Sequence, residues 1–325
     1  MIIELQGTTT SQIAKRLVEV REEGGAVALG RVLTLVVITE AADNEAAIRA
    51  ANAASSEHPM RVIVLHTDDG TGPSTLNAEI RVGRDAGAGD VVVLHASGDS
   101  ARDPETLVQG LLLPDAPVVA WWPDHGMMAP SRSPIGRIAQ VRIIDTQHAA
   151  DGAEALTEIA EHFAPGDTNL TWTRLTRWRA QLAAVLDQPP YEQIERAEVV
   201  ARRGSAGAIL MAGWLQARLQ APVELVWQEA DEQAHNLRAV RLHRASGPIE
   251  LERLSPTTAR LRQPGQPEQL IPLTVRDTTE ALAEELRSLA PDEMYAEALL
   301  EGVPVLCANG VCRFDFEAET AGGGR

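Results

Sequence analysis

Continuous apolar runs alternate with segments of helical spacing in the first half of the chain. Three runs rich in β-branched residues cover 26–39, 61–66 and 118–122, a pattern typical of strands buried on both faces. Amphipathic segments, with apolar residues three and four positions apart, lie between them. This strand–helix–strand order predicts a parallel sheet with right-handed crossovers. Two further strands, 77–84 and 90–96, are expected to form a hairpin or a short crossing.

The second half has a different pattern, which begins after a Pro-Gly loop at 164–167. Helical spacing over 169–186 and a helix that begins near Gly207 flank one strand at 194–201. Five short apolar segments follow, separated by turns rich in glycine and proline: 223–228, 237–244, 249–254, 258–262 and 270–275. Turn residues at this spacing predict an antiparallel meander.

The sequence therefore predicts an α/β fold in two domains. Residues 1–165 are expected to form an N-terminal alternating α/β domain with a mostly parallel sheet. Residues 166–325 are expected to form a C-terminal α+β domain with a mixed or antiparallel sheet. A chain of 325 residues is long for one core and sufficient for two. The glycine-rich end, from about residue 318, is expected to be a flexible tail.

Two adjacent tryptophans end the third apolar run, within the sequence LLLPDAPVVAWWP at 111–123. Adjacent strand residues point to opposite faces of a sheet, so Trp121 and Trp122 cannot share an environment. One ring is expected in the core. The other is expected on the second face, in a cleft or at a partner.

Composition limits the classes of protein that need consideration. The net charge is −17 and Lys15 is the only lysine, which argues against binding to nucleic acid or to an anionic membrane. The acidity serves solubility or steers a basic partner. No apolar run approaches the length of a membrane span, and the first residues lack a signal layout, so a cytoplasmic protein is expected.

No segment carries a recognisable catalytic motif. The glycines of 85–90 lack the third glycine and the helix of a dinucleotide-binding fingerprint, and no phosphate loop, nucleophile elbow or paired-histidine metal motif occurs. One turn is a candidate anion site, because Arg202 and Arg203 end a strand and small residues to Gly207 open a helix. Plain capping of that helix by Ser205, with solvated arginines, is the simpler interpretation.

The segment 172–179 mixes arginine with tryptophan. Leu175, Trp178 and Leu182 form a core stripe at helical spacing, which leaves Arg174 and Arg177 outward. An ordinary amphipathic helix explains this pattern. A contact surface for a protein partner is the second interpretation, because tryptophan and arginine are enriched at binding hot spots.

The two cysteines flank an Asn-Gly pair near the end of the chain. Asn309-Gly310 is a strong signal for a two-residue hairpin, which would place Cys307 opposite Cys312 in disulfide range. A reversible redox clip is one interpretation of this pair. Two reduced thiols in a cytosolic hairpin are the other.

Several segments together resemble the OpcA family of glucose-6-phosphate dehydrogenase assembly proteins. They are 21–37, 51–65, 111–123, 170–183 and 212–219. The resemblance implies a non-catalytic partner of glucose-6-phosphate dehydrogenase that promotes its assembly or activates it allosterically. It would thereby support NADPH production in the oxidative pentose phosphate pathway. It implies no catalytic, cofactor-binding or metal-binding residues.

The residues expected to contact that enzyme are chosen by residue type. They are Trp121, Trp122, Arg174, Arg177, Arg202 and Arg203. Some family members are thought to be controlled by thioredoxin, but the resemblance does not place Cys307 and Cys312 on their cysteines. Two alternatives stay open. One is a sugar-phosphate- or nucleotide-binding protein or enzyme that uses the Arg202–Gly207 turn as an anion site, and the other is a structural subunit without regulatory effect.

Overall fold

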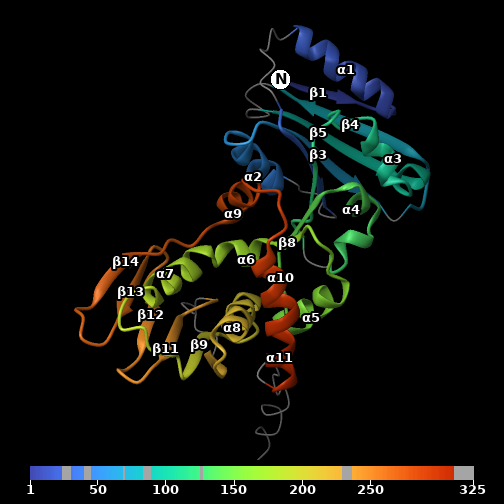
Figure 1. Ribbon diagram of the computed structural model, residues 1–325. Coiled ribbons are helices and arrows are strands. Elements are labelled where there is room, and N and C mark those ends of the chain that lie inside the picture. The colour runs from blue at the N-terminus through green and yellow to red at the C-terminus, as the bar shows by residue number, and fades with distance from the viewer. Residues whose placement is uncertain are drawn as a thin grey trace, which may run out of the picture. The chain divides into compact units, whose positions relative to one another are not determined.

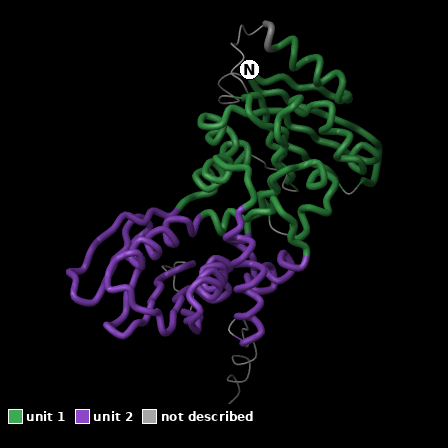
Figure 2. The backbone as a smooth tube through the Cα atoms, in the orientation of Figure 1, with its two compact units in different colours: residues 1–145, 162–173, 276–291 green, residues 146–161, 174–275, 292–325 purple. Residues whose placement is uncertain are grey.

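The fold is that of a computed structural model, which describes residues 1–23, 31–39, 45–68, 70–82, 89–124, 127–228 and 236–310 (Figure 1). The chain divides into two compact units (Figure 2). Unit 1 comprises Met1–Asp145, His162–Thr173 and Arg276–Pro291. Unit 2 comprises Thr146–Glu161, Arg174–Val275 and Asp292–Arg325. Segments of the two units interleave along the chain, so the units do not coincide with the two contiguous domains expected from the sequence. The boundary near 165 stays a prediction.

Unit 1 is built on an eight-stranded sheet in the order β1-β4-β5-β3-β2-β6-β7-β8. The strands are β1 Ile2–Leu5, β2 Leu33–Ile38, β3 Met60–Thr67, β4 Thr75–Arg81, β5 Asp90–Ser97, β6 Val118–Trp121, β7 Val141–Ile144 and β8 Asp167–Asn169. Among the described strands of this sheet, β4 pairs antiparallel with β1 and β5 and the other pairs are parallel, so the predicted mostly parallel sheet is confirmed. The hairpin of β4 and β5 is confirmed as well.

Helices cover both faces of this sheet. The helices of unit 1 are α1 Thr10–Glu23, α2 Glu45–Ser55, α3 Pro104–Gln109, α4 Pro134–Ile138, α6 Leu170–Arg174, which ends at the boundary with unit 2, and α9 Thr278–Glu285. Helices α2 and α9 share one apolar core with the alternate residues of the strands that include Val64 and Val93. Leu94 points to the other face. Leu5 of β1 lies in the same row of residues across the sheet and points towards α1, so α1 covers that second face.

Unit 2 is built on a six-stranded mixed sheet in the order β10-β9-β11-β12-β13-β14. The strands are β9 Arg196–Arg202, β10 Val223–Gln228, β11 Ala239–His243, β12 Ile249–Arg253, β13 Thr258–Arg262 and β14 Gln269–Pro272. β11 to β14 form an antiparallel meander, as predicted for four of the five segments. The first of the five, 223–228, is β10 and instead pairs in parallel with β9, so its predicted place in the meander is wrong. The mixed sheet expected for the second half is confirmed.

The helices of unit 2 are α5 Gly152–His162, whose last residue falls in unit 1, α7 Thr176–Leu186, α8 Ala206–Leu219, α10 Glu293–Glu297 and α11 Val303–Ala308. A π-helical turn, Ala298–Gly302, joins α10 to α11. Trp178 of α7 is buried, and the guanidinium carbon of Arg253, on β12, lies 5.3 Å from its ring centroid. The opposite side of this sheet carries ion pairs, such as Arg241 with Glu250 at 2.7 Å. No helix among the described residues is long and apolar enough to cross a membrane.

Candidate functional site

Both tryptophans at the end of β6 are buried. Trp121 is 0% exposed and Trp122 is 5% exposed. Trp121 shares the core with α2 and α9. The two rings do point to opposite faces, but helices and loops cover both faces, so neither ring is available as an exposed contact. The expectation that one ring stays unburied is therefore wrong. Trp121 lines a cavity described below, and the role of either residue in a partner contact stays a prediction.

Arg174 and Arg177 lie at a break between two helices. The single helix expected over 169–186 is divided into α6 and α7 at Leu175, which adopts φ −82° and ψ −8°. Both arginines are half-buried. Nη1 of Arg177 donates to the carbonyl oxygen of Thr274 at 3.0 Å, so this side chain secures the end of the meander. Part of each side chain stays accessible, and the role of the two arginines as partner contacts stays a prediction.

The Arg202–Gly207 turn is closed to an anion. The Ser205 hydroxyl caps α8 by accepting from the backbone N–H of Ala208 at 3.2 Å. A Cβ built on Gly152 would lie 2.5 Å from the backbone nitrogen of Ala206 and 2.6 Å from the carbonyl oxygen of Gly204. The backbone of α5 therefore occupies the space in front of α8, and capping is the correct interpretation. The alternative that places a phosphate in this turn is corrected.

The two arginines of this turn remain on the surface. Arg202 and Arg203 are exposed, and no side-chain ion pair or hydrogen bond joins either of them to a described residue. They could take part in a contact with a protein, and that role stays a prediction.

The cysteine segment adopts a helix and not a hairpin. Cys307 lies in the last turn of α11, and Gly310 follows the helix with φ +77°. Asn309-Gly310 ends the helix here, because glycine adopts the left-handed conformation at a helix C-terminus without the strain that a Cβ would cause. The predicted hairpin is wrong over 307–310. Cys307 is engaged in a disulfide, and Cys312 lies outside the described residues. The described residues contain no cluster of three or more metal-ligating side chains.

A cavity of about 450 Å³ lies at the topological switch point of unit 1. The chain proceeds from β2 to β3 on one side of the sheet and returns to β6 on the other, and ligands of open α/β sheets bind outside the carboxyl ends of such strands. The described lining residues come from the ends of β2 and β6 and from α2 and α9. They are Thr39, Ala46, Ala47, Arg49, Ala50, Trp121, Pro123, Asp124, Asp277, Thr278 and Thr279.

The chemistry of this cavity does not suit a pyrophosphate. The segment between β2 and α2 contains no glycine and two acidic residues, Glu40 and Asp43, and α2 itself begins with a third, Glu45. Asp124 and Asp277 add two carboxylates to the wall. The Thr39 hydroxyl donates to Asp124 at 2.6 Å and links the ends of β2 and β6. Phosphate recognition at a switch point relies on a glycine-rich turn before the helix, and the segment between β2 and α2 has no glycine in its sequence.

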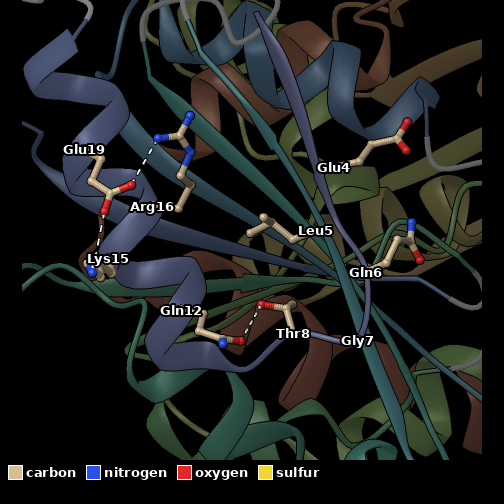
Figure 3. A pocket seen from close by; sticks show the side chains of 9 residues that line it. All are labelled: Glu4, Leu5, Gln6, Gly7, Thr8, Gln12, Lys15, Arg16 and Glu19. Carbon is tan, nitrogen blue, oxygen red and sulfur yellow. Dashed lines mark hydrogen bonds and ion pairs between the residues drawn. The ribbon is translucent and has the colours of Figure 1, made fainter.

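A second hollow, which we call the β1–α1 groove, lies at the edge of the same sheet (Figure 3). Its volume is about 450 Å³. It is lined by Glu4, Leu5, Gln6, Gly7, Thr8, Gln12, Lys15, Arg16 and Glu19. A capping box at the start of α1 builds one end of it. The Thr9 hydroxyl accepts from the Gln12 N–H at 3.3 Å, and the Gln12 side chain accepts from the Thr9 N–H at 3.0 Å.

Sequence reasoning missed this groove because β1 has only four residues. The sequence signal for this strand is the apolar pair Ile2-Ile3 with polar residues beside it. Such a segment is too short to show the two-residue period of a strand. The polar stripe of α1 was more visible, because Gln12, Arg16 and Glu19 follow helical spacing next to the buried stripe of Ile13 and Leu17.

Comparison with solved structures finds distant likenesses. The 3-ketoreductase KijD10 from Actinomadura kijaniata is 12% identical, with a TM-score of 0.47 over 84% of this chain and 95% of that chain. Glucose-6-phosphate 1-dehydrogenase from Mycobacterium avium is 12% identical, with a TM-score of 0.44 over 86% of this chain and 92% of that chain. An oxidoreductase from Sinorhizobium meliloti is 9% identical, with a TM-score of 0.47 over 85% and 96%.

No curated protein matches the sequence. Two family models match it. The glucose-6-phosphate dehydrogenase subunit N-terminal domain matches residues 51–161, and the corresponding C-terminal domain matches residues 165–299. Both matches carry the OpcA designation, they follow one another in the expected order, and together they span more than half of the chain. The chain therefore belongs to the OpcA family of glucose-6-phosphate dehydrogenase assembly proteins.

Proposed function

We propose that this protein is a non-catalytic subunit that assembles with glucose-6-phosphate dehydrogenase and activates it, which raises NADPH supply through the oxidative pentose phosphate pathway. The observation that carries the proposal is the pair of family matches over 51–161 and 165–299. Two domains that are named for one enzyme's subunit and that lie in order along one chain favour a partner of that enzyme.

The chemistry of the fold supports a non-catalytic role. The switch-point cavity is lined by Asp124 and Asp277 and lacks a glycine-rich turn. The helix N-terminus at α8 is occupied by Ser205 and by the backbone of Gly152. The two places that the topology and the sequence offered for a phosphorylated ligand are therefore unsuited to one.

Activation by a partner of this kind is a matter of linkage. A subunit that binds the active or oligomeric form of the enzyme better than the inactive form shifts the population towards the active form. A coupling free energy of about 1–3 kcal/mol corresponds to a roughly 5- to 150-fold change in affinity between the two forms. A docking surface of ordinary size is sufficient for this, and no catalytic residue is required.

The test is a titration of glucose-6-phosphate dehydrogenase from the same cell with this protein at fixed substrate, while light scattering follows the mass of the enzyme. A saturable rise in rate together with a joint complex is expected. A flat titration without a complex would contradict the proposal. A joint complex without a rise in rate would contradict the activating role and would favour the interpretation as a structural subunit.

Thermal unfolding with glucose 6-phosphate, NADP and inorganic phosphate tests the ligand-binding alternative. A ligand at about 100 times its Kd stabilises a fold by about 2.7 kcal/mol, which is a readily measured shift. We expect no shift with any of the three. A shift that saturates would show a ligand site and would favour the sugar-phosphate or nucleotide alternative.

A further inference from the structure

The first strand of the sheet in unit 1 has one open edge. Among the described strands, β1 stands at the end of the order and pairs with β4 alone. Ile2 is 53% exposed, and Glu4 and Gln6 are exposed as well. An edge of this kind presents unpaired N–H and C=O groups to any chain that lies beside it.

The register identifies which backbone groups face outward. Met1 and Val82 exchange both of their hydrogen bonds, each at 3.0 Å. In an antiparallel ladder, hydrogen-bonded pairs alternate with pairs whose groups point away from the partner strand. Ile3 and Leu5 therefore bond to β4, whereas the N–H and C=O groups of Ile2 and Glu4 point away from it. No hydrogen bond to another described residue takes up these outward groups.

The β1–α1 groove borders this edge on one face of the sheet. Leu5 and Arg16 point into it, while Glu4 and Gln6 point to the other side of the strand (Figure 3). A strand added at the edge would therefore place alternate side chains in the groove and the remaining ones beside Glu4. The open edge and the adjoining groove together match an extended chain better than a compact ligand.

Charge defines what such a chain must carry. Glu4 lies directly opposite Glu79 of β4. Glu79 has a partner in Arg81, but no ion pair joins Glu4 to a described residue. Like charges directly opposite each other destabilise a strand pair, and a basic side chain placed beside Glu4 would relieve that repulsion. A second copy of this chain paired about Glu4 would instead oppose Glu4 to Glu4.

We propose that β1 and the β1–α1 groove are a docking site for an extended, basic segment of a partner protein, which adds a ninth strand to the sheet by β-augmentation. The inference rests on the proposed function, because it takes glucose-6-phosphate dehydrogenase as the protein that supplies the segment. Backbone hydrogen bonds to Ile2 and Glu4 provide affinity. The carboxylate of Glu4 selects a basic residue at the opposite position.

Proline at an outward position tests the edge without disturbing the fold. Glu4→Pro removes one outward N–H and covers the edge with the proline ring, while the bonds between β1 and β4 remain, and proline is tolerated on edge strands at such positions. Ile2→Pro repeats the test at the second outward position. Glu4→Gln removes only the charge. Glu224→Gln is the matched control, because Glu224 is an exposed carboxylate on the edge strand β10 of the other sheet.

The readouts are the Kd for glucose-6-phosphate dehydrogenase by light scattering and the hydrogen exchange of the Glu4 amide, free and in the complex. We expect Glu4→Pro and Ile2→Pro to weaken binding by about tenfold or more with thermal unfolding unchanged. Glu4→Gln should weaken binding by up to about fivefold, and Glu224→Gln should have no effect. The Glu4 amide should exchange freely in the free protein and be protected in the complex.

Three outcomes would overturn the docking site. Wild-type binding with an unchanged Kd in both proline variants would place the contact elsewhere and leave the proposed function standing. An unprotected Glu4 amide in the complex would do the same. A dimer of this protein alone that Glu4→Pro dissociates would show that a second copy occupies the edge. Failure of the wild type to bind the enzyme would instead remove the proposed function itself.

Discussion

At the scale of single residues, Arg142 and Asp167 form the most deeply buried ion pair between described side chains of unit 1. Their side chains are 8% and 2% exposed, and Nε of Arg142 donates to Asp167. Arg142 also donates to the carbonyl oxygens of Ala139 at 2.9 Å and Pro165 at 2.5 Å. Asp167 accepts a second bond from the Ala164 N–H at 2.8 Å. The pair thus joins β7 to β8 at the edge of the sheet.

Arg142→Met is expected to lower the free energy of unfolding by about 3–5 kcal/mol, because it leaves a buried carboxylate without a counter-ion. Burial already raises the pKa of Asp167 above its ordinary value, against the opposing hydrogen bond from Arg142. Urea unfolding at neutral pH measures the loss. Arg102→Met is the control, because the Arg102–Asp99 pair is exposed, and its effect should stay within about 0.5 kcal/mol.

The same variant predicts a pH dependence. A carboxyl whose pKa is raised on folding contributes stability below its unfolded pKa and loses that contribution as pH rises through the folded pKa. Removal of Arg142 raises the pKa of Asp167 further. The difference in free energy of unfolding between wild type and Arg142→Met should therefore shrink when pH falls from 7 towards the ordinary carboxyl range of about 4. A deficit that is the same at pH 7 and at about pH 4.5 would show that the lost charge pair is not its cause.

The tryptophans show what single-residue reasoning predicts and what it leaves open. Alternation along β6 correctly assigns Trp121 and Trp122 to opposite faces. It does not say what covers each face. The cover for Trp121 includes α9, which lies more than 150 residues further along the chain. No local pattern near β6 encodes that contact.

At the scale of elements, α8 and the π-helical turn cross at two glycines. A Cβ on Gly302 would lie 1.9 Å from the carbonyl oxygen of Gly213, and one on Gly213 would lie 2.8 Å from the carbonyl oxygen of Ala298. The two backbones are therefore in direct contact. Gly302→Ala should cost roughly 1–3 kcal/mol of stability through overpacking, measured by thermal or urea unfolding of the full chain.

Glu301→Ala is the control for this crossing, because Glu301 is the exposed neighbour of Gly302 in the same turn. Its effect should be within about 0.5 kcal/mol. A stabilising effect of Gly302→Ala would show that helix propensity, which favours alanine over glycine by about 1 kcal/mol, governs stability there and not the close approach. A neutral Gly302→Ala would mean that the crossing yields without strain.

The segment around Cys307 explains why some elements could not be read from sequence. Asn-Gly is the preferred centre of a tight hairpin, and the same residues suit the end of a helix. The choice depends on tertiary contacts: Val303 and Leu306 are buried in unit 2, which favours a helix over 303–308. Strands β1 and β8 were missed for a different reason, since four and three residues carry no countable period. The long runs of β2 and β3 were predicted because burial on both faces leaves few polar positions. β6 is as short as β1, but it was predicted because it is continuously apolar and bounded by prolines.

At the scale of the whole molecule, the order of strands and helices follows from the sequence, but the division into units does not. α9 is a helix capped by Asp277, which accepts from the Glu280 N–H at 2.8 Å. Its apolar stripe shows that it packs on something. α9 belongs to unit 1 because it packs on α2, and the two helices are more than 200 residues apart in the sequence. One such contact joins His58 Nε2 to the Ala283 carbonyl oxygen at 3.2 Å.

A fragment that ends before α9 should therefore fail to fold as a stable unit. Residues 1–175 contain all eight strands of the sheet but leave the apolar face of α2 uncovered. Leu282 and Leu286 are almost fully buried, and burial of each leucine contributes about 1.5–3 kcal/mol. Their loss alone removes about 3–6 kcal/mol, which is comparable with the whole stability of many domains, about 5–15 kcal/mol.

The measurement compares fragment 1–175 with the same fragment joined through a flexible linker to residues 276–291. We expect broad, non-cooperative thermal unfolding for the first and a single cooperative transition for the second. Leu282→Ala in the linked fragment should move its transition back towards that of the short fragment, because a buried Leu→Ala change costs about 2–5 kcal/mol. If fragment 1–175 alone unfolded cooperatively at the same midpoint as the linked one, α9 would be dispensable, and unit 1 would be the contiguous N-terminal domain that the sequence suggests.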